Sequence, residues 1–127
     1  MKLLTHNLLS SKCLKGVKVG YPLRIEAQDV KISESEFNME FVAKMVPKLD
    51  WKVLVNAAIQ AGHGNDLPQE LIENYEKNEE FLKKIHHVLM EVEIINGFLI
   101  CPETGRKFPI TSGIPNLLLK EDESGYV

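Results

Sequence analysis

Cysteine is scarce in this sequence: Cys13 and Cys101 are the only two among 127 residues. Two thiols form at most one disulfide. A structural zinc site needs four tetrahedrally arranged donors, and the cysteines and histidines here do not have the usual short ligand spacing. We therefore expect two buried or half-buried thiols and no metal site. A site built from Cys13, Cys101, His6 and one further ligand is the alternative.

Long apolar runs are also missing. No stretch approaches the roughly 20 apolar residues of a membrane span. The opening segment, MKLLTHNLLSSK, interrupts a short apolar stretch with Thr, His and Asn, which makes it a poor secretory signal. We therefore expect no membrane contact, reduced thiols, and a location in the cytoplasm and nucleus.

The chain has no excess of positive charge. Its 15 Lys and Arg residues are outnumbered by 18 Asp and Glu residues, which gives a formal net charge of −3. The basic residues are dispersed, and no stripe of basic and aromatic residues suits a nucleic-acid backbone. A protein of this composition is not expected to hold nucleic acid alone. A free-standing nucleic-acid-binding β-module stays open as the alternative function.

Recognisable catalytic motifs are missing too. The sequence contains no glycine-rich phosphate loop, no GxGxxG and no nucleophile elbow. His86 and His87 are adjacent on a predicted helix, but no motif places an Asp or Ser beside them. We interpret both as structural histidines, and we expect the chain to have no catalytic residue and no enzyme activity of its own.

The sequence does contain helical periodicity in its middle. Residues 33–92 hold three amphipathic segments, whose predicted N-caps are Asn38, Asp50 and Asn78. Pro47 is expected to end the first helix and Gly62 the second. A further short helix is predicted from Pro68 through Leu71 and Ile72.

Strand patterns occupy both ends of the chain. In YPLRIEAQDVKI, apolar and polar residues alternate from Leu23 onward, which predicts a half-buried strand. Near the other end, Asn96-Gly97 predicts a hairpin or turn. LICPETGRKFPI predicts a β-hairpin that turns through Pro102 and Gly105.

Together these patterns predict an α+β fold. A small antiparallel β-domain is formed by both chain ends, residues 1–32 and 93–120, and residues 33–92 form an inserted helical domain. Residues 121–127 are expected to be a flexible acidic tail.

Apolar side chains are concentrated at the two chain ends, in KLLTHNLL and GIPNLLL. A strand pair cannot bury all of them on one face, because alternate side chains point in opposite directions. Either the helical insert covers them, or another protein does. Composition does not decide between these two interpretations.

Four segments in the same order closely resemble the multifunctional methyltransferase subunit family, the small activating subunits of several eukaryotic methyltransferases. They are MKLLTHNLL, EFNMEFVAKMVPKLDW, HHVLMEVEIINGFLICPETGRKFPI and GIPNLLL, and the resemblance runs from Met1 to about Leu119. It implies a zinc-ribbon-like β-domain made from both chain ends, with a helical domain inserted.

The resemblance also implies a function. Family members have no activity alone; they form heterodimers with S-adenosylmethionine-dependent methyltransferases that act on tRNA, on small-subunit rRNA and on a glutamine of the translation termination factor. The subunit covers an apolar surface of the catalytic partner and extends its sheet. S-adenosylmethionine is bound by the partner, and nucleic acid is met only through it.

Zinc is not carried over from the family. In metal-binding members, four cysteines match Ser11, Gly16, Cys101 and Thr104 here, so only Cys101 is retained. We expect this hairpin to be the descendant of a zinc knuckle that is held by packing alone, with no cofactor in the chain.

The segments that match the family also supply the predicted partner-binding residues. The choice of individual side chains within the segments is our inference. The predicted residues are Thr5, Asn7, Leu8, Phe41, Met45, Ile114, Pro115, Asn116 and Leu117.

Overall fold

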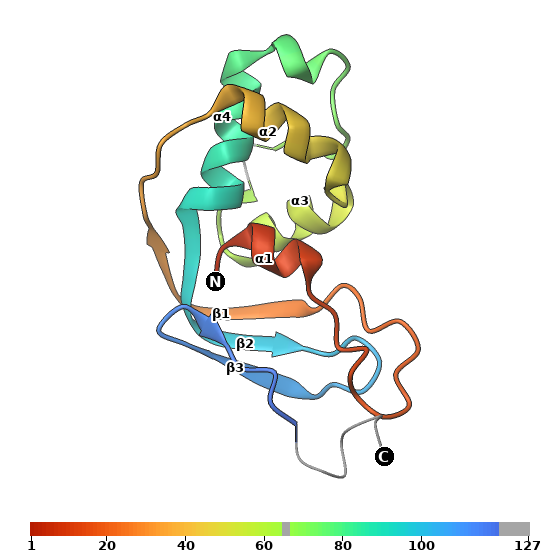
Figure 1. Ribbon diagram of the computed structural model, residues 1–127. Coiled ribbons are helices and arrows are strands. Elements are labelled where there is room, and N and C mark those ends of the chain that lie inside the picture. Colours follow the sequence, from red (N-terminus) through yellow and green to blue (C-terminus); the bar gives the residue numbers. More distant parts are fainter. Residues whose placement is uncertain (65–66, 120–127) are drawn as a thin grey trace.

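The protein is described by a computed structural model, which places residues 1–64 and 67–119. One layer is a four-stranded antiparallel sheet with strand order β1-β2-β3-β4 (Figure 1). The strands are β1 (Arg24–Ile32), β2 (Val92–Ile100), β3 (Lys107–Thr111) and β4 (Ile114–Pro115). The predicted α+β class is confirmed, because one strand lies near the N-terminus, three follow near the C-terminus, and helices fill the sequence between them. The predicted acidic tail lies outside the described residues.

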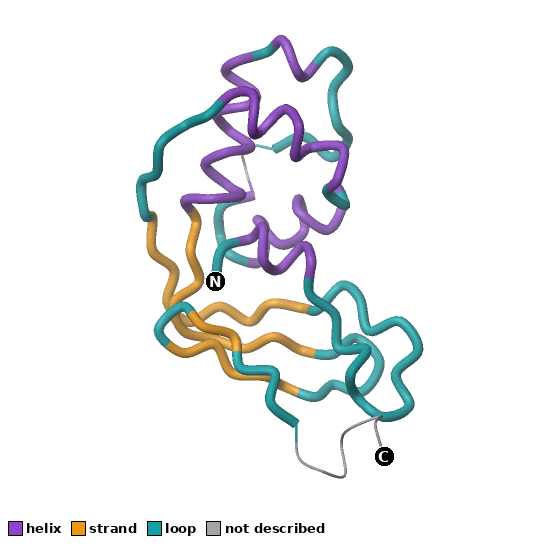
Figure 2. The backbone as a smooth tube through the Cα atoms, in the orientation of Figure 1, coloured by secondary structure: helices purple, strands orange, loops and turns teal. Residues whose placement is uncertain are grey.

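The helices gather at one end of the molecule and the strands at the other (Figure 2). They are α1 (Leu3–Leu8), α2 (Met39–Met45), η1 (Val46–Lys48), α3 (Trp51–Gln60), η3 (Tyr75–Lys77), α4 (Glu79–His86) and the π-helical η4 (His87–Glu91). All three predicted N-caps are confirmed: their side chains accept hydrogen bonds from backbone N–H groups at 3.0, 3.3 and 3.1 Å for Asn38, Asp50 and Asn78. None of the helices in the described ranges is long and apolar enough to cross a membrane.

The predicted short helix from Pro68 to Ile72 is wrong. Five residues give too few intrahelical hydrogen bonds to offset the cost of nucleating a helix. The Pro68 carbonyl instead accepts a hydrogen bond from the Trp51 indole at 3.2 Å. Regular structure resumes after Asn74, whose φ of 57° places it in the left-handed region before η3.

The turn predicted at Asn96-Gly97 is also wrong, because both residues lie inside β2. Gly97 faces Ala27 of β1, directly beside an irregularity in the β1–β2 register between Ala27 and Asp29. A Cβ on Gly97 would lie 2.3 Å from the Glu26 carbonyl oxygen, and φ at Gly97 is +156°. The glycine therefore permits a close approach of two strands at a β-bulge, which is a different use of the residue from a hairpin turn.

The hairpin predicted over LICPETGRKFPI is confirmed. Gly105 donates its backbone N–H to Cys101 O at 3.0 Å, and Cys101 donates to Arg106 O at 2.9 Å. Gly105 adopts φ +77°, a conformation that glycine tolerates without steric cost. The turn joins β2 to β3, so Cys101 lies at the tip end of the sheet.

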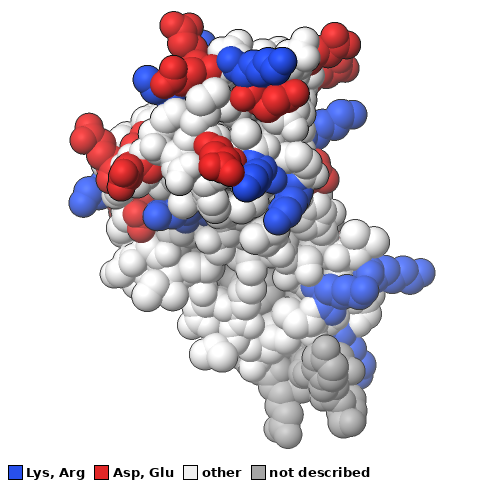
Figure 3. Space-filling model, turned by 45° about the horizontal axis from the view of Figure 1, so that its top comes forward, with Lys and Arg blue, Asp and Glu red and all other residues white. Residues whose placement is uncertain are grey.

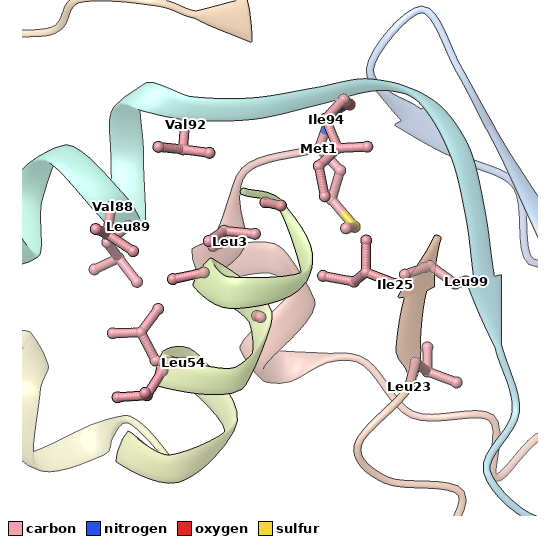
Figure 4. Packing of buried hydrophobic residues seen from close by; sticks show 14 of the residues in the cluster. Met1, Leu3, Leu23, Ile25, Leu54, Val88, Leu89, Val92, Ile94 and Leu99 are labelled. Carbon is pink, nitrogen blue, oxygen red and sulfur yellow. Dashed lines mark hydrogen bonds between the residues drawn. The ribbon is translucent and has the colours of Figure 1, made fainter. Parts of the chain in front are cut away.

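A single buried cluster unites the sheet with the helices. Leu3 of α1 is fully buried, with Leu54 and Leu89 from helices on one side and Ile25 from the sheet on the other (Figure 4). The Met1 amino group donates to the carbonyls of Ile94 and Gly113, each at 2.6 Å. The N-terminal segment is therefore built into the junction between the sheet and the helices. The protein's helices thus cover part of the apolar side chains at the two chain ends.

Candidate partner-binding surface

The open edge of the sheet is formed by β4 and the residues that follow it. β4 pairs with β3 through only two residues, Ile114 opposite Thr111 and Pro115 opposite Ile110. Pro115 has no backbone N–H, which is typical of edge strands. An open groove of about 540 Å³ runs along this edge, lined by Thr111, Ile114, Pro115, Asn116, Leu117 and Leu118.

Exposed apolar side chains flank this groove. Ile114 is 69% exposed and Leu118 is 79% exposed, whereas Leu117 is half-buried and packs against the protein's own core. Leu118 was not among the predicted residues. The Asn116 side chain accepts a hydrogen bond from Leu118 N–H at 2.9 Å and so forms a local turn. Within this turn Leu117 is half-buried and Leu118 is exposed.

The opposite edge of the sheet is partly occupied. The backbone N–H of Ile25 in β1 donates to the Gln60 side chain of α3 at 2.6 Å. A strand added at this position would have to displace that contact. Of the two edges, β4 is therefore the more accessible for an additional strand.

Helix α1 places Thr5 and Leu8 on the surface and Asn7 in the interior. Leu8 is 70% exposed and Asn7 only 4%. The Asn7 amide donates to Asp50 O and accepts from Asp50 N–H, both at 3.0 Å. Asn7 thus fixes the end of α1 on the start of α3, so it orients Leu8 and is not itself available at the surface.

Helix α2 presents a smaller apolar contribution. Phe41 is 42% exposed, and Met45 is half-buried against the core. Because α2 and η1 lead directly into the Asp50 cap of α3, the end of α2 is only a few residues away from the Asn7 contact.

Hydrogen bonds connect these segments through α1. The Met1 amino group binds Gly113 O just before β4, and Asn7 binds Asp50 just after η1. Helix α1 lies between the sheet and the other helices in Figure 1. In the space-filling view, charged side chains gather over the helical end, whereas the middle of that face carries few (Figure 3).

Of the four positions that match metal-binding cysteines, Ser11 and Thr104 contact Cys101. The Ser11 hydroxyl donates to Cys101 Sγ at 3.0 Å, and Thr104 N–H donates to the same sulfur at 3.4 Å. Burial opposes ionisation of the thiol, but hydrogen bonds from Ser11, Thr104 and the Glu103 backbone outweigh it and lower the pKa of Cys101.

This donor set does not fit a structural zinc ion. It offers one thiol with two neutral hydroxyls, and Gly16 has no side chain to contribute. Zinc in such sites takes four thiolate or imidazole ligands. Among the residues that the structure describes, no group of three or more His, Cys, Asp or Glu side chains is placed to hold a metal ion.

The two adjacent histidines have structural partners. His86 lies 3.1 Å from the Ser35 hydroxyl, and His87 Nδ1 lies 2.8 Å from a Glu91 carboxylate oxygen. The other oxygen of Glu91 accepts the Ser35 N–H at 2.9 Å. These contacts fasten the segment before α2 onto η4.

The buried His6 makes stability depend on pH. Its Nε2 donates to Leu23 O at 2.6 Å, and its buried Nδ1 has no partner. Burial lowers the pKa of His6 below 6.5, although the bond to Leu23 opposes this. The unfolded chain therefore binds the proton first, and the stability present above pH 6.5 is lost as pH falls.

We expect the free energy of unfolding to decrease by up to about 1.4 kcal/mol per pH unit below pH 6.5 through this one group. Urea unfolding of the wild type and of His6→Gln at pH 7.5 and 5.5 measures the difference between their pH slopes. The glutamine amide can still donate to Leu23 O but does not titrate. Equal slopes for the two proteins contradict this assignment.

An open sheet edge with exposed apolar side chains is typical of a protein-interaction module. The family model for Trm112p-like protein matches residues 2–113. The chain belongs to this family.

Several similar proteins match over nearly the whole chain. The chain is 53% identical to the multifunctional methyltransferase subunit TRM112-like protein of Bos taurus over 98% of each chain. It is 50% identical to the TRM112 homolog A of Arabidopsis thaliana, over 97% of this chain and 99% of the relative. It is also similar in fold, with a TM-score of 0.59 and 23% identity, to a chain of the E. cuniculi Mtq2–Trm112 complex, over 93% and 95% of the two chains. That complex is described as responsible for methylation of the eRF1 translation termination factor.

Proposed function

We propose that this chain is a non-catalytic activating and stabilising subunit of S-adenosylmethionine-dependent methyltransferases. The partners are enzymes that modify tRNA, small-subunit rRNA and a glutamine of the translation termination factor, and each forms a heterodimer with this chain. The relatives' name, multifunctional methyltransferase subunit, supports this assignment. The observation that carries it is the open β4 edge with its exposed Ile114 and Leu118.

The partner contact extends the catalytic subunit's sheet. A strand of the partner pairs beside β4, and its apolar residues cover Ile114, Leu118 and Leu8. Full burial of each such side chain contributes about 1.5–3 kcal/mol. Thr5, Phe41, Met45, Pro115, Asn116 and Leu117 complete the proposed surface, and Asn7 supports it from within by holding α1 in place.

Because this chain binds the partner only in its folded form, its binding stabilises the partner by mass action. S-adenosylmethionine is held by the catalytic subunit, and this chain contributes no cofactor. Its effect on cofactor affinity is indirect, because a partner whose loops are ordered by the contact spends more time in the binding-competent state. RNA is met through the partner, which agrees with the net charge of −3 on this chain.

The finer architecture belongs to the same proposal. We assign residues 1–32 and 93–120 to a zinc-ribbon-like β-domain and residues 33–92 to an inserted helical domain. Support comes from the hydrogen bonds of Ser11 and Thr104 to Cys101 Sγ, the first of which joins the loop near Ser11 to the β2–β3 turn. The proposed location is the cytoplasm and nucleus, which agrees with two cysteines that are both free thiols in the structure.

Co-expression tests the function directly. A candidate methyltransferase is produced with and without this chain, and its soluble yield and S-adenosylmethionine-dependent activity are measured. We expect both to rise with the chain present and the two proteins to elute together from a sizing column. No change in yield or activity for any of the three partner classes contradicts the proposal. A gel shift of nucleic acid by the purified chain alone would instead support a nucleic-acid-binding β-module.

A further inference from the structure

One exposed carboxylate gathers three backbone donors. Glu103, in the turn between β2 and β3, accepts hydrogen bonds from the N–H groups of Lys18, Val19 and Gly20 at 3.1, 2.9 and 2.6 Å. The donors are consecutive residues of a loop more than eighty positions earlier in the chain. Consecutive N–H groups that converge in this way form a concave site for an anion, and a charged acceptor makes such bonds stronger than a neutral one.

The same two segments meet a second time at the base of the loop. Ser11 donates its hydroxyl to Cys101 Sγ at 3.0 Å, and its N–H to Gly20 O at 2.8 Å. Residues 11–20 are thereby closed into a loop, whose own Leu14 and Val17 side chains are buried. The loop is attached to the turn over 101–105 at both of its ends.

Gly20 connects the two attachments. Its N–H points to Glu103 and its carbonyl accepts from Ser11, with φ at +61°. A Cβ at this position would lie 2.7 Å from Ser11 Oγ and 2.8 Å from Lys12 N. The backbone of residue 20 therefore sits where a side chain would prevent the loop from closing.

We propose that the Glu103 carboxylate, by accepting all three N–H groups, is what holds the loop over residues 11–20 onto the turn over residues 101–105. The attachment joins the two chain ends and needs only an acceptor from one segment and main-chain donors from the other, whereas the donors around Cys101 do not fit a zinc ion. The fold of this end of the molecule is then independent of zinc. This inference does not rest on the proposed function, since Glu103 is not part of the partner-binding surface.

Amide hydrogen exchange measures the attachment residue by residue. In Glu103→Gln, one oxygen acceptor and the negative charge are lost, and Glu103→Ala removes the acceptor entirely. We expect the amides of Lys18, Val19 and Gly20 to exchange at least about tenfold faster in these variants. The amides of Ile94 and Leu99, in the middle of the sheet, should keep the wild-type rate.

The matched control is Glu26→Gln, which removes an exposed carboxylate whose ion pair is with Lys107 at 3.4 Å. It should leave the exchange of the loop amides unchanged. Unchanged loop exchange in both Glu103 variants overturns the proposal. So does retention of one zinc ion per wild-type chain, measured by elemental analysis, if a chelator removes it and the loop amides then lose their protection.

Discussion

Ile114→Asp is expected to abolish the gain in soluble yield and activity that a methyltransferase partner obtains from this chain, without unfolding the chain itself. Ile114 is 69% exposed, so its replacement removes little of the chain's own packing. In the complex, the change removes about 1.5–3 kcal/mol of apolar burial and leaves an unpaired carboxylate at the contact. We expect affinity to fall by about a hundredfold or more, as measured by titration calorimetry with the purified partner.

The control for this variant is Ile59→Asp. Ile59 is 53% exposed on α3, so the same chemical change is made on an exposed isoleucine away from β4. Leu117→Asp is less informative, because Leu117 packs against the chain's own core and the substitution combines a binding defect with a folding defect. Thermal melting of each variant separates these effects. If Ile114→Asp binds the partner with wild-type affinity, the β4 edge is not the contact.

Features that depend on neighbouring residues were predictable from the sequence. An N-cap is a contact between residues three positions apart, so Asn38, Asp50 and Asn78 predict where their helices begin. Gly62 ends α3 for an equally local reason: its φ is +81°, and the N–H of His63 returns to Ala58 O at 2.8 Å. The alternation of apolar and polar residues at the start of β1 is also a local pattern that predicts a strand, and Ile25 is buried between exposed Arg24 and Glu26.

Features that depend on contacts across the chain were not predictable in this way. Asn7 looks like a surface residue within a short polar segment, and only the fold brings it to Asp50, 43 positions later. Nothing in the sequence around Glu103 indicates which groups its carboxylate binds, because its donors lie 83 to 85 positions away. For the proposed partner-binding surface, the family resemblance suggested the segments, and burial in the structure distinguishes neighbouring residues such as Leu117 and Leu118.

Gly97 illustrates the same distinction. Asn-Gly is a strong turn signal over a few residues, but here the pair lies within the long antiparallel pairing of β1 with β2. The reason for glycine is the Glu26 carbonyl of the adjacent strand, and nothing in the local pattern reveals it. The misassigned residue is therefore one of the most constrained positions in the protein.

Gly97→Ala is accordingly expected to be among the most destabilising single-methyl additions in this chain. The new Cβ would meet Glu26 O at 2.3 Å in a conformation that side chains rarely adopt, so β1 and β2 must separate at the bulge. We expect the free energy of unfolding to fall by about 2–4 kcal/mol, from backbone strain and overpacking together. Urea denaturation monitored by circular dichroism gives the value.

Gly105→Ala separates the two contributions. Gly105 also has a positive φ, +77°, but a Cβ there meets no atom within 4 Å. Only the conformational cost of about 1 kcal/mol should then appear. The difference between the two variants is the steric cost of pressing a methyl group onto the adjacent strand plus the extra backbone strain of φ +156° over φ +77°. Equal losses at both positions would mean that β1 and β2 yield freely at the bulge, and that the close approach at Gly97 does not constrain the sheet.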